Sequence, residues 1–136
     1  MKLFAHLNFG GNCREAFQFY EENVGGKITM MMTQGDMPEG NRAPDTIAAS
    51  IAHARMTIAG TELIGNDVPA AHFQPMRSVY LYLAVNSAEE AERIFGLLSP
   101  QGQVFVPMAE TFYATRFGML RDRFGVSWTV ICERPR

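Results

Sequence analysis

The sequence is poor in cysteine, in clustered charge and in long apolar runs. No apolar stretch approaches the roughly 18–20 residues that span a bilayer, and the opening Met1–His6 lacks the apolar core of a signal peptide. The formal charge is −2 without a run of like charges, which excludes the clustered basic surface of a nucleic-acid-binding protein. We therefore expect a cytoplasmic protein with neither a membrane nor a nucleic-acid partner.

The two cysteines, Cys13 and Cys132, lie far apart and share no spacing typical of metal ligands. Two buried thiols in a reducing compartment are the favoured interpretation, and a disulfide between them stays open. The chain has 136 residues, of which 47% are hydrophobic. This length and composition predict one globular domain over residues 1–136 with a real core.

In the first half, Leu3–Phe9 alternates apolar with mixed residues, which predicts a strand with two different faces. A helix is predicted next, because Asn12 stands three residues before Glu15 as in a capping box. Its apolar stripe consists of Cys13, Ala16, Phe17, Tyr20 and Val24. Three more strands are predicted at Lys27–Thr33, Ile47–Ile58 and Thr61–Gly65, with a tight turn at Ala59-Gly60. The polar segment 35–45 is interpreted either as a lid or as a disordered surface loop.

The second half repeats this order. Val79–Val85 alternates like a strand, Ser87 and Glu90 form a second capping box, and the stripe is Ala88, Ala91, Phe95 and Leu98. Three strands follow at Gln103–Val106, Ala114–Leu120 and Gly125–Cys132, with Trp128 on the helix-facing side. The repeat predicts an α+β fold of two βαβββ modules, about 1–67 and about 77–136. Their curved mixed sheet is expected to leave one face as a cleft.

Four motifs run from one end of the chain to the other. They are Asn12-Cys13-x-Glu15-Ala16-Phe17-x-Phe19-Tyr20; Ile51-Ala52-His53-Ala54 with Ile58-Ala59-Gly60 and Asp67; Glu110-Thr111-Phe112-Tyr113 with Phe117-Gly118; and Asp122-x-Phe124-Gly125-Val126-x-Trp128. As a set they resemble the PhnB-like branch of the glyoxalase/bleomycin-resistance/extradiol dioxygenase (vicinal oxygen chelate) superfamily. The resemblance implies a paired βαβββ fold and a homodimer. Some members are labelled demethylubiquinone methyltransferases, but the sequence shows no Gly-rich strand–turn–helix and no parallel βαβ series to hold S-adenosylmethionine.

The resemblance also implies where a metal would bind. Metal-dependent members place four His or Glu ligands on the first and last strands of each module, where the metal polarises two neighbouring substrate oxygens. In this chain those positions fall near Phe4 and at Ile64, Tyr80 and Thr129. None of these is a strong ligand for a divalent metal, and only a shifted register brings in His6. We therefore expect no cofactor at the usual metal site.

His53 and Glu110 are the candidate catalytic residues. His53 lies on the polar parity of its strand, where a neutral imidazole could act as a base, orient a ligand or serve only as a hydrogen-bonded structural group. Glu110 precedes an aromatic stretch and could reach over a pocket or lie solvated in a loop. If the two converge, they form an acid–base pair, and together with His6 they could form a two-His, one-carboxylate metal site.

The residues of the cleft-lining parity are aromatic and weakly polar. The candidate ligand-binding residues are His6, Asn8, Arg55, Tyr80, Tyr82 and Phe112. The leading hypothesis is a metal-free homodimer that binds a small, partly aromatic organic ligand, with or without acid–base chemistry. The alternatives are a metal-assisted lyase, isomerase or dioxygenase that uses His6, His53 and Glu110, and a drug-sequestering resistance protein of the bleomycin-binding type.

Overall fold

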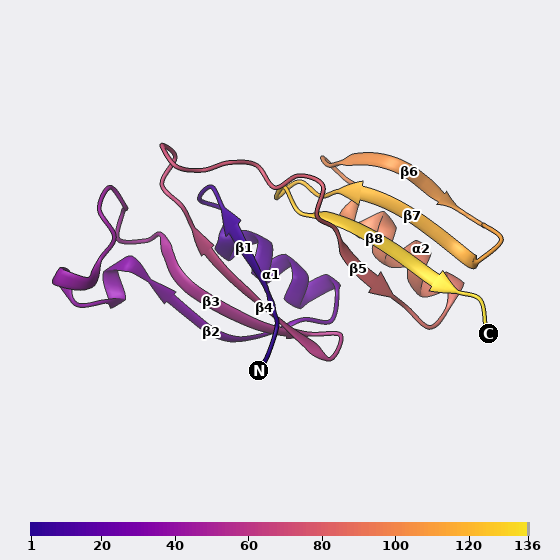
Figure 1. Cartoon of the computed structure of the whole chain (residues 1–136), viewed down its shortest axis with the longest axis horizontal. Helices are drawn as coiled ribbons and strands as arrows, with labels where there is room; N and C mark the ends of the chain where they lie inside the picture. Colours follow the sequence, from indigo (N-terminus) through magenta and orange to yellow (C-terminus); the bar gives the residue numbers. More distant parts are fainter. Residues whose placement is uncertain (136) are drawn as a thin grey trace. The chain divides into compact units, whose positions relative to one another are not determined.

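The chain folds as two compact units, Met1–Pro75 and Met76–Arg136. The structure, a computed structural model, describes residues 1–135. Each unit contains a strand, a helix and three further strands in that order (Figure 1). The predicted α+β fold of two βαβββ modules is thereby confirmed, while the expectation of a single domain stays a prediction.

The first unit is a four-stranded mixed sheet with one helix on one face. Its elements are β1 (Ala5–Phe9), α1 (Cys13–Asn23), β2 (Lys27–Thr33), β3 (Ile51–Ile58) and β4 (Thr61–Asp67). The strand order is β1-β4-β3-β2, and β1 runs parallel to β4 while the other pairs are antiparallel. The α1 helix contacts β2, β3 and β4, so the opposite sheet face is left without a helix.

The second unit has the same topology. Its elements are β5 (Leu81–Ala84), α2 (Ala88–Leu98), β6 (Gln103–Ala109), β7 (Ala114–Arg121) and β8 (Ser127–Glu133). The strand order is β5-β8-β7-β6, with β5 parallel to β8. The α2 helix contacts β7 and β8. The repeat suggested by the sequence is therefore a repeat of strand order as well as of element order.

A glycine lies under each helix, where an aromatic ring approaches the sheet. A Cβ atom on Gly65 of β4 would lie 2.7 Å from Cζ of Phe17, and one on Gly118 of β7 would lie 2.6 Å from Cε2 of Phe95. Both distances are well below van der Waals contact, so a larger residue would push the helix away from its sheet. The strand registers place Gly65 opposite Ala54, and Gly118 opposite Val130.

The N-terminus of α1 corrects one sequence-based expectation. Asn12 makes no capping hydrogen bond, so the predicted capping box does not form. Instead, the buried carboxylate of Asp67 accepts hydrogen bonds from the backbone N–H groups of Cys13, at 3.0 Å, and Ile51, at 2.9 Å. A charged acceptor at a helix N-terminus is favourable, and it takes over the role predicted for the nearer side chain.

The second helix follows the prediction more closely. Oγ of Ser87 accepts a hydrogen bond from the backbone N–H of Glu90 at 3.1 Å. The other half of the box is missing, because the Glu90 carboxylate binds the guanidinium of Arg93, with 2.7 Å between Oε1 and Nη2. The hydrogen bond from Arg93 is the main cause that lowers the pKa of Glu90.

Asp122 organises the turn between β7 and β8. Its Oδ1 accepts hydrogen bonds from the backbone N–H groups of Phe124, at 2.9 Å, and Val126, at 3.0 Å, and its Oδ2 accepts one from Nε1 of Trp128 at 2.9 Å. Trp128 is 2% exposed, which confirms its predicted core position. The motif Asp122-x-Phe124-Gly125-Val126-x-Trp128 therefore has a structural role, because it shapes the turn between β7 and β8.

The strand predicted from Ile47 begins only at Ile51. The carbonyls of Ala48 and Ser50 accept hydrogen bonds from Gly35 and Gln34, at 2.9 and 2.8 Å, so this stretch folds against the 3₁₀ turn Gln34–Asp36 (η1). A second turn, Glu39–Asn41 (η2), follows. The guanidinium of Arg42 then donates hydrogen bonds to two carbonyls of the same segment, those of Gly35 and Met37. Segment 35–45 is thus a set of hydrogen-bonded turns, and its role as a lid stays a prediction.

Cys13 and Cys132 are both buried and free, as predicted. Burial, followed by the charge of Asp67, raises the pKa of the Cys13 thiol to about 12, so this thiol stays neutral at physiological pH. Within residues 1–135, no helix is long and apolar enough to cross a membrane.

Candidate functional site

The strand register defines which residues lie side by side on the helix-free face of each sheet. His6 is paired with Ile64 between β1 and β4, and Tyr82 is paired with Thr129 between β5 and β8. The first-strand residues paired with Ile64 and Thr129 are thus His6 and Tyr82, each two residues after the positions near Phe4 and at Tyr80 that the resemblance implies.

Neither pair fits a divalent metal. An imidazole beside an isoleucine in the first unit, and a phenol beside a hydroxyl in the second, fall short of the three or four His, Cys or carboxylate ligands of such sites. Within the part of the chain that the structure describes, no group of three or more His, Cys, Asp or Glu side chains is arranged to hold a metal ion.

The helix-free face of the first sheet carries polar side chains that form hydrogen bonds and an ion pair with one another. Nε2 of His6 lies 2.6 Å from Oδ1 of Asn66. Nε and Nη2 of Arg55 donate hydrogen bonds to Oε1 of Glu62, at 3.1 and 3.0 Å. His53 is half-buried two residues before Arg55 on the same strand, and Asn8 is exposed on β1. The roles predicted for these residues stay predictions.

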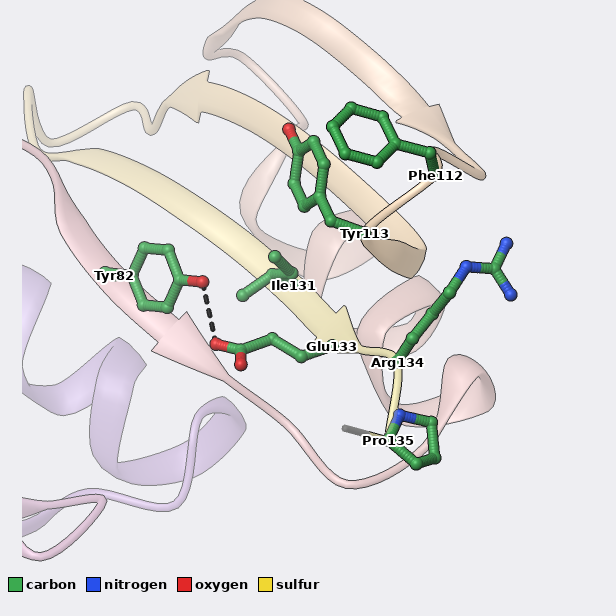
Figure 2. Close-up of a pocket in the computed structure, with 7 residues that line it drawn as sticks. All are labelled: Tyr82, Phe112, Tyr113, Ile131, Glu133, Arg134 and Pro135. Carbon is green, nitrogen blue, oxygen red and sulfur yellow. Dashed lines mark hydrogen bonds between the residues drawn. The ribbon is translucent and has the colours of Figure 1, made fainter.

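The second unit contains a pocket of about 480 Å³. It lies where β5, the 110–113 connection and the end of β8 meet (Figure 2). The lining residues are Tyr82, Phe112, Tyr113, Ile131, Glu133, Arg134 and Pro135. A concave site of this volume with a few polar groups is typical of small-molecule binding.

The pocket joins aromatic surface to one carboxylate. Tyr82 donates a hydrogen bond from Oη to Oε1 of Glu133 at 2.8 Å. Ile131 is only 1% exposed, whereas Phe112 is 92% exposed. The Phe112 and Tyr113 rings meet edge to face, with 4.9 Å between their centroids. The site therefore offers ring surface beside a negative charge.

The 110–113 connection is held in shape by its own motif and by Arg134. Oγ1 of Thr111 accepts hydrogen bonds from the backbone N–H groups of Tyr113, at 3.3 Å, and Ala114, at 3.0 Å. Nε and Nη2 of Arg134 donate hydrogen bonds to the Thr111 carbonyl, at 3.2 and 3.0 Å. Nη2 also forms an ion pair with Oε1 of Glu110 at 3.2 Å. This corner fixes the two aromatic residues at the pocket mouth.

The structure brings together two of the predicted ligand-binding residues, Tyr82 and Phe112. Tyr80 packs against Phe105 instead, with 6.3 Å between ring centroids. Glu110 lies beside the pocket on a side chain that is 66% exposed. Its catalytic pairing with His53 stays a prediction.

Five lining residues were missed: Tyr113, Ile131, Glu133, Arg134 and Pro135. Ile131 and Glu133 lie two and four residues after Thr129 on the last strand and therefore on the same face, so continuing the alternation from Thr129 would have found both.

The two βαβββ units form the glyoxalase/bleomycin-resistance fold. A crystal structure of a glyoxylase/bleomycin resistance protein/dioxygenase domain from Frankia sp. EAN1pec matches the chain with a TM-score of 0.64 at 15% identity, covering 98% of both chains. Over residues 1–131 the chain matches the protein-family model described as 3-demethylubiquinone-9 3-methyltransferase, and it belongs to this PhnB-like family. The resemblance drawn from the four motifs is confirmed.

Individual relatives are similar over nearly their whole length. The crystal structure of protein PA1353 from Pseudomonas aeruginosa is 38% identical, with a TM-score of 0.89 and 99% of each chain covered. Protein YjdN of Escherichia coli (strain K12) is 31% identical, with 99% of each sequence covered. A putative 3-demethylubiquinone-9 3-methyltransferase, PhnB protein, from Bacillus cereus is 25% identical, with a TM-score of 0.82 and coverage of 97% of this chain and 99% of that one.

Proposed function

We propose that this protein binds a small organic, partly aromatic ligand in the pocket of its second unit, without a resident metal. The observation that carries the proposal is the pocket itself, in which exposed rings from Tyr82 and Phe112 stand around the buried side chain of Ile131. Exposed aromatic surface in a concave site is the main source of affinity for small ligands.

The absence of a metal is proposed from the chemistry of the residues. His6, Ile64, Tyr82 and Thr129 offer one imidazole where the family's metal needs several strong donors. No Lewis-acid step is therefore assigned to this chain. Methyl transfer is not proposed either, because both described sheets are mixed and each has one parallel pair, unlike the parallel series that carries a nucleotide at its strand ends.

A fragment titration followed by two-dimensional NMR tests the binding proposal. We expect small aromatic fragments to shift the resonances of the pocket residues, and Tyr82→Ala and Phe112→Ala to weaken this binding about tenfold each. Phe105→Ala is the matched control, because Phe105 is an exposed ring of the same unit that does not line the pocket. Fragments that bind equally well to all three variants would contradict the proposal.

Elemental analysis tests the metal-free part, together with thermal unfolding in Zn²⁺, Ni²⁺, Mn²⁺ and Fe²⁺. We expect no stoichiometric metal and no specific stabilisation. Stoichiometric metal that disappears in His53→Ala would overturn this part and favour the metal-assisted enzyme.

We also propose that the protein is a homodimer. Light scattering at micromolar concentration would then give twice the chain mass, and a monomeric mass would contradict the proposal.

A further inference from the structure

We propose that the ligand of the second-unit pocket is an organic cation, a small ammonium or guanidinium compound with an apolar group. This inference rests on the proposed function and adds the charge of the ligand. It follows from three features of the pocket: the partner of Glu133, the partners of Arg134 and the exposure of the aromatic rings.

Among the residues that the structure describes, Glu133 is the charged group of the pocket that has no ionic partner. Its carboxylate accepts a hydrogen bond from the hydroxyl of Tyr82 at 2.8 Å, and no Lys or Arg among residues 1–135 forms an ion pair with it. A phenol orients the carboxylate without neutralising it. The negative charge is therefore directed into the site and is available to a cation.

Arg134 lines the same pocket, but its charge is already matched. The guanidinium binds the Glu110 carboxylate at 3.2 Å and the Thr111 carbonyl at 3.0 and 3.2 Å. In Figure 2 this guanidinium points away from the Tyr82–Glu133 hydrogen bond. Glu110 therefore acts as a positioning residue that keeps the positive charge of Arg134 out of the site.

The aromatic rings favour the same ligand charge. Tyr82, Tyr113 and Phe112 are 59%, 44% and 92% exposed, so their surfaces are available to a ligand. The face of an aromatic ring is the negative end of its quadrupole and attracts cations. An anion would meet both Glu133 and these ring faces unfavourably. The exposed ring of Phe112 provides an apolar contact for the rest of the molecule.

Three probes of the same skeleton and different charge test the inference: 2-phenylethylammonium, 2-phenylethanol and phenylacetate. Each is titrated into the full chain at low ionic strength, and binding is followed by NMR shifts or calorimetry. We expect the ammonium to bind roughly tenfold more tightly than the alcohol and phenylacetate to bind most weakly. Added salt should weaken the binding of the ammonium more than that of the alcohol.

Variants that replace one carboxylate by an amide test which residue causes the preference for the ammonium. Glu133→Gln keeps the shape of the side chain and is expected to remove most of the roughly tenfold preference for the ammonium over the alcohol. Glu89→Gln is the matched control, because it removes the same charge from an exposed residue of the same unit. Glu110→Gln should weaken ammonium binding about two- to threefold, since it leaves the charge of Arg134 unmatched.

The outcomes separate this inference from the proposed function. Equal or tighter binding of the alcohol or of phenylacetate overturns the cation inference alone, as does full retention of the preference in Glu133→Gln. The same holds if other aromatic fragments bind in the pocket while none of the three probes does. If neither the probes nor the fragments bind there, the proposed function itself is overturned.

Discussion

Glu110 and Arg134 form an ion pair, with 3.2 Å between Oε1 and Nη2, at the corner where the 110–113 connection meets the end of β8. The glutamate therefore influences the pocket through the arginine. Its side chain is 66% exposed, and exposed ion pairs contribute little to the stability of a fold. The arginine contributes more, because it also donates two hydrogen bonds to the carbonyl of Thr111.

The first prediction follows from this difference. We expect Glu110→Gln to lower the free energy of unfolding by less than about 1 kcal/mol. Arg134→Ala, which also releases the 110–113 connection, should lower it by about 1–3 kcal/mol. Urea unfolding followed by fluorescence of Trp128, the single tryptophan, measures both. A larger loss of unfolding free energy in Glu110→Gln than in Arg134→Ala would contradict the greater structural contribution assigned to Arg134.

The second prediction concerns the buried carboxylate of Asp122. It accepts three hydrogen bonds, from two backbone N–H groups and from Nε1 of Trp128, so Asp122→Ala leaves buried donors unpaired. We expect a loss of about 2–4 kcal/mol in the free energy of unfolding. Trp128→Phe removes the hydrogen bond from Nε1 but keeps the two from the backbone. It should therefore lower the free energy of unfolding by less than Asp122→Ala does.

Circular dichroism during urea unfolding measures both variants, since one lacks the tryptophan. Glu39→Gln, at an exposed carboxylate, serves as the control. A loss below about 1 kcal/mol in Asp122→Ala would contradict a structural role for this motif.

The third prediction compares two glycines of the second unit. An added Cβ on Gly118 would meet Phe95 at 2.6 Å, whereas nothing lies within 4 Å of one on Gly96. Gly118→Ala should therefore destabilise the fold by about 1–3 kcal/mol. Gly96→Ala should stabilise it by about 0.5–1 kcal/mol, because Gly96 lies inside the α2 helix. Thermal unfolding measures the pair, and shifts of the same sign would contradict the packing described here.

The fourth prediction is a loss of stability at alkaline pH caused by Cys13. Burial raises the pKa of this thiol from its ordinary 9.0 to about 12 in the folded state. Above pH 9 the thiol ionises in the unfolded chain while it stays neutral in the folded one. Its contribution to stability is therefore complete below pH 9 and is lost as the pH rises from 9 toward 12.

Urea unfolding at a series of pH values measures this effect, with Cys13→Ala as the reference because its other alkaline titrations are unchanged. We expect the stability of the native chain to fall more steeply than that of Cys13→Ala above about pH 9, by at most about 1.4 kcal/mol for each pH unit. Parallel curves would contradict a buried neutral thiol.

The element order was predictable because its signals are local. The apolar stripe ending at Tyr20 and the alternation around Leu83 are properties of short segments. The start of β3 was not predictable, because the carbonyl of Ser50 is bound by Gln34, sixteen positions earlier. The cap of α1 was missed for the same reason, since Asp67 lies 54 positions beyond Cys13.

The candidate site was only partly predictable. Strand parity correctly put Tyr82 on the helix-free face, and the motif pointed to Phe112. Neither signal could show that the guanidinium of Arg134 binds the carbonyl of Thr111, twenty-three positions earlier. Contacts of this kind depend on where two separate segments meet in space, and no local pattern encodes that meeting.

The glycine under each helix has a consequence for how such a chain can change over time. Gly65 and Gly118 fix how closely each helix approaches its sheet, while the side chains of His6 and Tyr82 point to the opposite faces. Substituting an exposed side chain on a helix-free face therefore leaves the contact between that helix and its sheet unchanged. The duplicated framework gives one polypeptide two surfaces that mutation can diversify separately, one now rich in paired polar groups and the other in aromatic rings.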